Sequence, residues 1–204
     1  EPYLREVVNY LPIVRNDKYN TSARKFMLGC AKHAMQHENL PNNTHECREC
    51  GSCGVGCPYD RKMSGFVKWL RDARQLGATI YTDTKVDRLI SSGDQVREVH
   101  AHFIDGKTRP TKRTLVVKPN KGVVMAAGAI GTPAILLRSD LDLENRVGKY
   151  THIHPVTITI GKYPESTFPA YGVPDNMWTP KFADGPTGYL IETGSFYPVL
   201  SASA

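Results

Sequence analysis

Four closely spaced cysteines offer the most reactive group of side chains in the sequence. Cys47, Cys50, Cys53 and Cys57 follow the spacing C-x2-C-x2-C-x3-C, and Pro58 comes directly after the last of them. Thiolates at this spacing wrap iron–sulfur clusters in bacterial electron carriers. Zinc is a second ligand for such a group, although zinc sites usually separate two C-x2-C pairs. A tight loop of packed, unligated thiols is the third interpretation, and the spacing leaves all three open.

The cysteine count and the charge bound the class of protein. Five cysteines are an odd number, and their bunching argues against a framework of loop-closing disulfides. Such a cluster favours a reducing, intracellular compartment. The net charge of +6 is spread along the chain, which predicts a solvated surface and no nucleic-acid partner. A basic face against an anionic membrane remains an alternative, so membrane association stays open.

The apolar periodicity predicts the elements that position this loop. Helices are expected at residues 3–11, 22–38 and 64–77, the second capped by Ser22. Strands are expected where apolar and polar residues alternate or where an apolar run is short. These strands are 78–83, 85–90, 95–104, 113–118, 123–127, 156–160 and 189–192. Thr132 and Pro133 predict the start of another helix, ending near residue 138.

Two signals refine the middle of the chain. Asp105-Gly106 predicts a tight turn between antiparallel strands, so 95–118 is expected to form a small meander. His100 and His102 alternate with apolar residues there, and we expect them to face outward. The buried strand 123–127 ends in small residues and leads into a helix, an arrangement that lets a dinucleotide approach a helix N-terminus closely.

Several motifs occur in the order known from one enzyme family. They are Cys50-Gly51-Ser52-Cys53-Gly54-Val55-Gly56-Cys57-Pro58, Trp69-Leu70-Arg71-Asp72-Ala73 with Gly77-Ala78-Thr79-Ile80, Ala126-Ala127-Gly128-Ala129-Ile130-Gly131-Thr132-Pro133 with Ser139, Val147-Gly148-Lys149 with His154-Pro155, and Gly188-Tyr189 with Ile191-Glu192-Thr193. Together, between about residues 47 and 197, the sequence resembles the glucose-methanol-choline (GMC) oxidoreductases, and within them the long-chain fatty alcohol oxidases. Asp140 departs from the pattern, because a glycine usually follows the serine at that point.

The resemblance implies an α+β fold: part of a Rossmann-like FAD-binding sheet with a β-meander, and the beginning of an antiparallel-sheet substrate domain. We expect the FAD-binding part at residues 1–148, including a cysteine-rich loop at 45–63, and the substrate-binding part at 149–204. The resemblance places Val86 where a backbone meets the adenine of FAD. It places Ala127 and Gly128 near the ribityl or diphosphate portion.

The implied activity is oxidation of a long-chain alcohol to an aldehyde, with FAD as cofactor and oxygen or a carrier as electron acceptor. No catalytic residue is expected within these residues, because the family's catalytic histidine lies further toward the C-terminus. The glycine-rich diphosphate motif is also missing, so we expect this piece alone to be inactive. The enzymatic alternative is a sugar or polyol dehydrogenase with an iron–sulfur cluster at the four cysteines. The non-enzymatic alternative is a truncated metal-binding module.

Overall fold

The computed structural model describes residues 1–165, 167 and 171–194, and its chain forms two compact units. Unit 1 comprises Glu1–Ala78 together with the described residues from Ile160 onward, and unit 2 comprises Thr79–Thr159. The expected boundary between residues 148 and 149 concerns the domains of the whole protein and stays a prediction. Residues 195–204, at the end of the expected substrate-binding part, lie outside the described residues.

Short helices and antiparallel strands make up both units, and the predicted α+β class is confirmed. The helices are α1 (Pro2–Tyr10), α2 (Thr21–Lys32), the π-helical turn η1 (Phe66–Leu70), α3 (Arg71–Gln75), α4 (Gly128–Arg138) and the 3-10 turn η2 (Leu143–Asn145). The strands are β1 (Val14–Arg15), β2 (Glu38–Asn39), β3 (Pro41–Asn42), β4 (Thr84–Ser92), β5 (Gln95–Ile104), β6 (Pro110–Val117), β7 (Met177–Thr179) and β8 (Ile191–Glu192).

Unit 1 joins segments from both halves of the sequence. β1 pairs with β3, and a second sheet has the order β2-β7-β8, in which β7, from late in the sequence, pairs with β2 of the N-terminal part. Met177 in β7 is fully buried, as are Ala23 and Cys30 of the neighbouring α2. These side chains form the apolar core of unit 1, with Val173 beside them.

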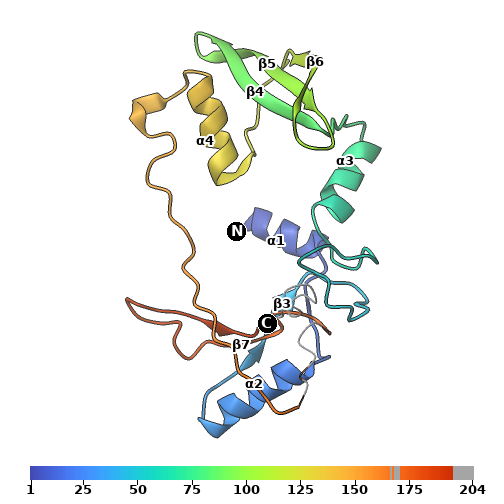
Figure 1. Cartoon of the computed structure of the whole chain (residues 1–204), viewed down its shortest axis with the longest axis vertical. Coiled ribbons are helices and arrows are strands. Elements are labelled where there is room, and N and C mark those ends of the chain that lie inside the picture. Colours follow the sequence, from blue (N-terminus) through green and yellow to red (C-terminus); the bar gives the residue numbers. More distant parts are fainter. Residues whose placement is uncertain (166, 168–170, 195–204) are drawn as a thin grey trace. The chain divides into compact units, whose positions relative to one another are not determined.

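Unit 2 is a three-stranded meander with one helix against it. β4, β5 and β6 follow one another in the sheet, all antiparallel, and α4 packs on β4 (Figure 1). The predicted Asp105-Gly106 turn is confirmed, since the Thr108 amide donates to the Asp105 carbonyl oxygen at 2.8 Å. Leu89, Ala101 and Ile135 form the buried centre of this unit.

Three predicted strands are wrong. Residues 78–83, 123–127 and 156–160 pair with no strand in the described part of the chain. A strand needs neighbours for its backbone hydrogen bonds, and an apolar run cannot supply them by itself. Val124 shows the consequence, because 91% of its surface is exposed.

Two helix boundaries also differ from the prediction. α2 is capped by Asn20, whose Oδ1 accepts from the Ala23 amide at 2.8 Å, and it ends at Lys32 because Ala34 takes a left-handed conformation. α4 begins at Gly128, four residues before Thr132. Its Pro133 lies inside the helix, although prolines near a helix start usually occupy the first turn.

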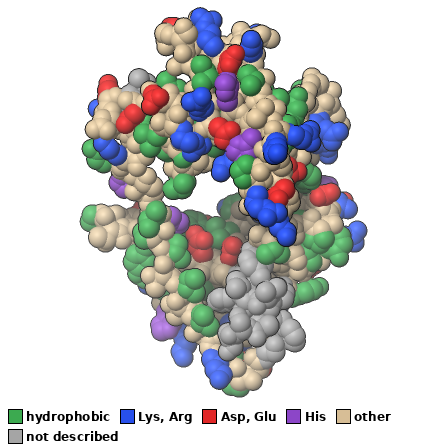
Figure 2. All heavy atoms as spheres, turned by 45° about the horizontal axis from the view of Figure 1, so that its top comes forward, with side chains coloured by type: hydrophobic (Ala, Val, Ile, Leu, Met, Phe, Trp, Pro, Cys, Tyr) green, Lys and Arg blue, Asp and Glu red, His purple; other side chains and the backbone are tan. Residues whose placement is uncertain are grey.

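Charged side chains of both signs lie on the surface. On the face shown in Figure 2, Lys and Arg side chains are interspersed with Asp and Glu. Ion pairs such as Lys18–Glu49 and Arg109–Asp105 join exposed or partly exposed side chains. Among the described residues, no helix has both the length and the apolar character needed to span a bilayer.

Candidate functional site

The N-terminus of α4 presents free backbone amides to solvent. Ala127 precedes the helix without a side-chain cap, and Gly128 opens it with φ of +76°. Both residues are exposed, and a Cβ placed on Gly128 would meet no atom within 4 Å. The first amides of a helix lack intrahelical partners and carry partial positive charge, so they bind phosphate groups well.

Thr132 shapes the entry to this helix. Its Oγ1 accepts a hydrogen bond from the Ala127 amide at 3.0 Å, and a Cβ on Gly131 would come within 3.0 Å of the Ala127 side chain. The small residues of the motif therefore let the incoming chain pass close to the first turn of α4. Thr132 was predicted to start the helix. It lies inside α4 instead and binds the amide of Ala127, the residue before the helix.

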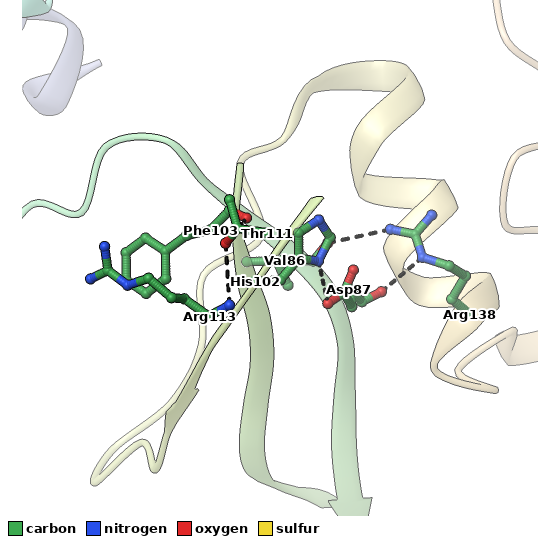
Figure 3. Close-up of polar contacts among 7 residues, drawn as sticks. All are labelled: Val86, Asp87, His102, Phe103, Thr111, Arg113 and Arg138. Atoms are coloured by element: carbon green, nitrogen blue, oxygen red, sulfur yellow. Dashed lines mark hydrogen bonds and ion pairs between the residues drawn. The ribbon is translucent and has the colours of Figure 1, made fainter. Parts of the chain in front are cut away.

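The other predicted cofactor contact, Val86, lies in β4 at the edge of the sheet. The β4–β5 register runs from Val86↔Ala101 to Arg88↔His100, so Asp87 is the extra residue of a β-bulge. Arg138 at the end of α4 reaches this bulge (Figure 3). Its Nε donates to the Asp87 carbonyl oxygen at 2.8 Å and its Nη2 to the Val86 carbonyl oxygen at 3.4 Å.

The side chain of the bulge residue is held as well. His102 Nδ1 lies 2.7 Å from Asp87 Oδ2, and the His102 side chain is only 15% exposed. The expectation that His102 faces outward is therefore wrong, because Asp87 from the neighbouring strand lies against it. The opposite ring nitrogen, Nε2, is buried without a hydrogen-bond partner among the described residues.

Unit 2 thus contains Val86, Ala127 and Gly128, the predicted FAD contacts, on one helix–strand pair. The uncapped start of α4 suits a diphosphate, and the β4 edge offers backbone groups that suit a nucleobase. These residues fit part of an FAD site. Arg138 and His102 were missed by sequence reasoning, because only their contacts with the Asp87 bulge distinguish them from ordinary surface residues.

The cysteine loop, residues 45–63, belongs to unit 1 and closes on itself at its base. Thr44 and Lys62 form an antiparallel bridge, and the His45 amide donates to the Arg61 carbonyl oxygen at 2.8 Å. The Gly172 amide also donates to the Glu49 carbonyl oxygen at 2.9 Å, which attaches the loop to the later part of the chain. These backbone contacts hold the four thiols in one segment of the unit.

The thiols differ in their surroundings, and all are free of disulfides. Burial, together with the neighbouring thiols of the loop, raises the pKa of Cys53. Burial alone would raise the pKa of Cys57 too, but the backbone amides of Tyr59, Arg61 and Lys62 stabilise its thiolate and lower the pKa. The Arg61 amide lies 3.3 Å from this sulfur.

Cys47 shares one of these features, since its sulfur accepts from the Glu49 amide at 3.3 Å. Within the described residues, however, no three Cys, His, Asp or Glu side chains are grouped closely enough to hold a metal ion. The assignment of Cys47, Cys50, Cys53 and Cys57 as metal ligands therefore stays a prediction.

An open cavity of about 500 Å³ lies beside the loop in unit 1. Cys53 and Lys62 form part of its wall, and Leu11, Leu40 and Val173 contribute apolar surface. Its volume falls within the range of about 300–1,000 Å³ that is usual for small-molecule pockets. No sequence pattern indicated this cavity, because its walls come from segments more than a hundred residues apart.

Comparison with known proteins defines the class. The GMC oxidoreductase family matches residues 1–156, and the chain belongs to this family. The N-terminal domain of the family is its Rossmann-like FAD-binding domain.

Individual relatives agree with this assignment. A long-chain-alcohol oxidase of Arabidopsis thaliana, FAO3, is 34% identical over 67% of this chain and 19% of its own length. A second one, FAO1, is 30% identical over 75% of the chain and 21% of its own length. An uncharacterized GMC-type oxidoreductase of Mycobacterium tuberculosis is 33% identical over 80% of the chain and 25% of its own length. The chain thus spans a quarter or less of these relatives.

Proposed function

We propose that the whole protein uses FAD to oxidise the CH–OH group of a long-chain alcohol to an aldehyde, with oxygen as electron acceptor. The observation that carries this proposal is the pairing of an uncapped, glycine-opened α4 with the bulged edge of β4. It occurs at the positions where resemblance to the alcohol oxidases predicts FAD contacts. The substrate of these relatives, long-chain alcohols, supports the substrate class.

The residues of this chain would bind and orient the cofactor. Gly128 and the amides that follow it would hold the diphosphate, Ala127 would lie beside the ribityl–diphosphate portion, and the backbone at Val86 would meet the adenine. Bound FAD supplies the acceptor for the hydride that leaves the alcohol carbon. We assign no proton-transfer step to these residues. We place the FAD-binding part at residues 1–148 and the start of the substrate-binding part at 149–204.

The test uses the purified full-length protein. We expect the absorbance of bound flavin, and hydrogen peroxide formation with a long-chain primary alcohol but little with ethanol. Gly128→Ala should lower flavin occupancy, because an alanine is strained at φ of +76°. Gly106→Ala is the matched control, since its surroundings are also open and its φ is not in the left-handed region. Absence of flavin from the folded wild-type protein would refute the proposal.

The second candidate is a sugar or polyol dehydrogenase that passes electrons through an iron–sulfur cluster to a carrier. The observation in its favour is that backbone amides donate to the sulfurs of Cys47 and Cys57, because such bonds stabilise thiolate ligands. Iron and acid-labile sulfide in stoichiometric amounts in the anaerobically purified protein would support it. Their absence there would exclude the cluster, and metal-independent folding would exclude the metal-binding module.

A further inference from the structure

The C-terminal end of α4 holds three backbone groups of β4 that the neighbouring strand leaves free. Arg138 donates to the carbonyl oxygens of Val86 and Asp87, at 3.4 and 2.8 Å. Ser139 Oγ accepts from the Leu89 amide at 2.8 Å. β4 is an edge strand, so these groups would otherwise face solvent or a ligand. The end of α4 therefore fixes the direction in which these backbone groups at the β4 edge point.

The bulge explains why one side chain reaches two successive carbonyls. In a regular strand, consecutive carbonyl groups point to opposite sides, and only one of the two would face α4. The extra residue, Asp87, breaks this alternation. The planar, forked guanidinium group of Arg138 can donate to both oxygens at once, which a lysine cannot do in the same geometry.

The bulge is also held from its other side. The Asp87 carboxylate meets His102 of β5 at 2.7 Å, while the Asp87 carbonyl accepts from Arg138 of α4 (Figure 3). The backbone at Val86 is thus held in place by two elements before any ligand arrives. Such pre-organisation lowers the cost of ordering a site on binding.

A second arginine of unit 2, in the sheet, has a different partner. The guanidinium group of Arg113 in β6 stacks over the Phe103 ring at 4.5 Å from its centre, and lies apart from the bulge in Figure 3. It carries the same charge as Arg138 and belongs to the same unit. Arg113 is therefore a matched control for the removal of Arg138.

We propose that Arg138 is a positioning residue that sets the Val86–Asp87 bulge as an adenine-reading backbone edge. This inference rests on the proposed FAD site, and it adds the residue that shapes its base-recognition end. Because α4 also presents Gly128 at its other end, one rigid helix of 11 residues connects the proposed diphosphate and adenine contacts. Arg138 would act through the backbone, without touching the base.

The test measures binding of two nucleotides to the full-length apoprotein by calorimetry. ADP carries adenine, whereas inosine diphosphate has a carbonyl oxygen in place of the 6-amino group, which the second lone pair of the Val86 carbonyl oxygen, beside the one that Arg138 binds, would repel. We expect the wild type to prefer ADP by about tenfold, the effect of one base-reading contact. Arg138→Met should weaken ADP binding by about tenfold or more and abolish most of this preference. Arg138→Lys, which keeps one donor, should fall between the two, and Arg113→Met should match the wild type.

The ratio of the two affinities separates positioning from stability. If Arg138→Met weakens both nucleotides equally and leaves the ratio unchanged, the inference is overturned, because the residue then acts only on folding. A wild type that binds FAD without distinguishing the two nucleotides also overturns it, while the proposed FAD site stands. A folded wild type that binds neither FAD nor ADP refutes the proposed function itself. Arg138→Lys keeps the test decisive if Arg138→Met does not fold.

Discussion

Ser139→Ala tests the contact between α4 and β4 most directly. Ser139 Oγ accepts from the Leu89 amide at 2.8 Å and donates to the Ile135 carbonyl oxygen at 2.6 Å. Leu89 is only 4% exposed, so water has little access to its amide once the hydroxyl is removed. Ile135 keeps a partner, because the Ser139 amide donates to the same carbonyl at 3.1 Å.

The magnitude follows from the group left without a partner. A buried backbone donor that loses its acceptor costs about 1–3 kcal/mol, and the loss at the Ile135 carbonyl adds little because that oxygen remains bonded. If this cost falls on local opening of the α4–β4 contact, the Leu89 amide should exchange with solvent about 5- to 150-fold faster. Amides of the β5–β6 pairing should change less, since Ser139 does not contact those strands.

Hydrogen exchange followed by mass spectrometry, on the full-length protein, provides the assay. Peptides covering β4 and α4 should lose protection in Ser139→Ala. Ser92→Ala is the control, because Ser92 is exposed at the end of the same strand. Equal exchange of the peptide that contains the Leu89 amide in wild type and Ser139→Ala would refute the reasoning, and so would equal loss of protection in the Ser92 variant.

Three further predictions concern the rest of the chain. Met177→Ala should lower the free energy of unfolding in urea by about 2–5 kcal/mol, because Met177 is only 2% exposed. Leu76→Ala is the control: this residue is 88% exposed, and the free energy should change by less than about 0.5 kcal/mol. Equal effects of the two substitutions would contradict the assignment of the core. Asp140→Gly should leave the thermal midpoint unchanged or raise it, because Asp140 has φ of +56°, which glycine adopts without strain; a lower midpoint would contradict this. The amides of Arg109 and Lys107 lower the pKa of Asp105 below its unfolded value near 3.8. The stability that the Asp105 carboxylate contributes is therefore present above that value and is lost as the pH falls through the lower folded pKa. The difference in urea stability between wild type and Asp105→Asn should disappear in acid, and a difference that persists there would contradict this assignment.

Local patterns predicted the meander well because its signals are local. The alternation in residues 95–104 and the Asp105-Gly106 turn need only neighbouring residues to form a hairpin. The departure at Asp140 shows the same principle, because the position where the family has glycine does take a left-handed conformation. A turn is determined by a few dihedral angles, and one residue type can reveal it.

The wrong strand predictions share one physical cause. The apolar run 123–127 has strand composition, but it lacks a pairing partner among the described residues. Strand formation depends on hydrogen bonds to another segment, whose identity is not written in the run itself. The same limit hid the pairing of β2 with β7, whose residues Asn39 and Met177 are opposite each other but far apart in sequence.

Motifs in a known order were enough to indicate the family, and resemblance to it assigned roles to Val86, Ala127 and Gly128, while cysteine spacing drew attention to the loop. How these residues are supported follows from the packing of the fold. The Asp87 bulge, the two hydrogen bonds of Arg138 and the largely covered His102 ring depend on side chains from β4, β5 and α4 meeting in space. A motif indicates which residue types a site uses. The direction in which the backbone groups of the site point depends on packing and hydrogen bonds between distant segments, and no local pattern contains that information.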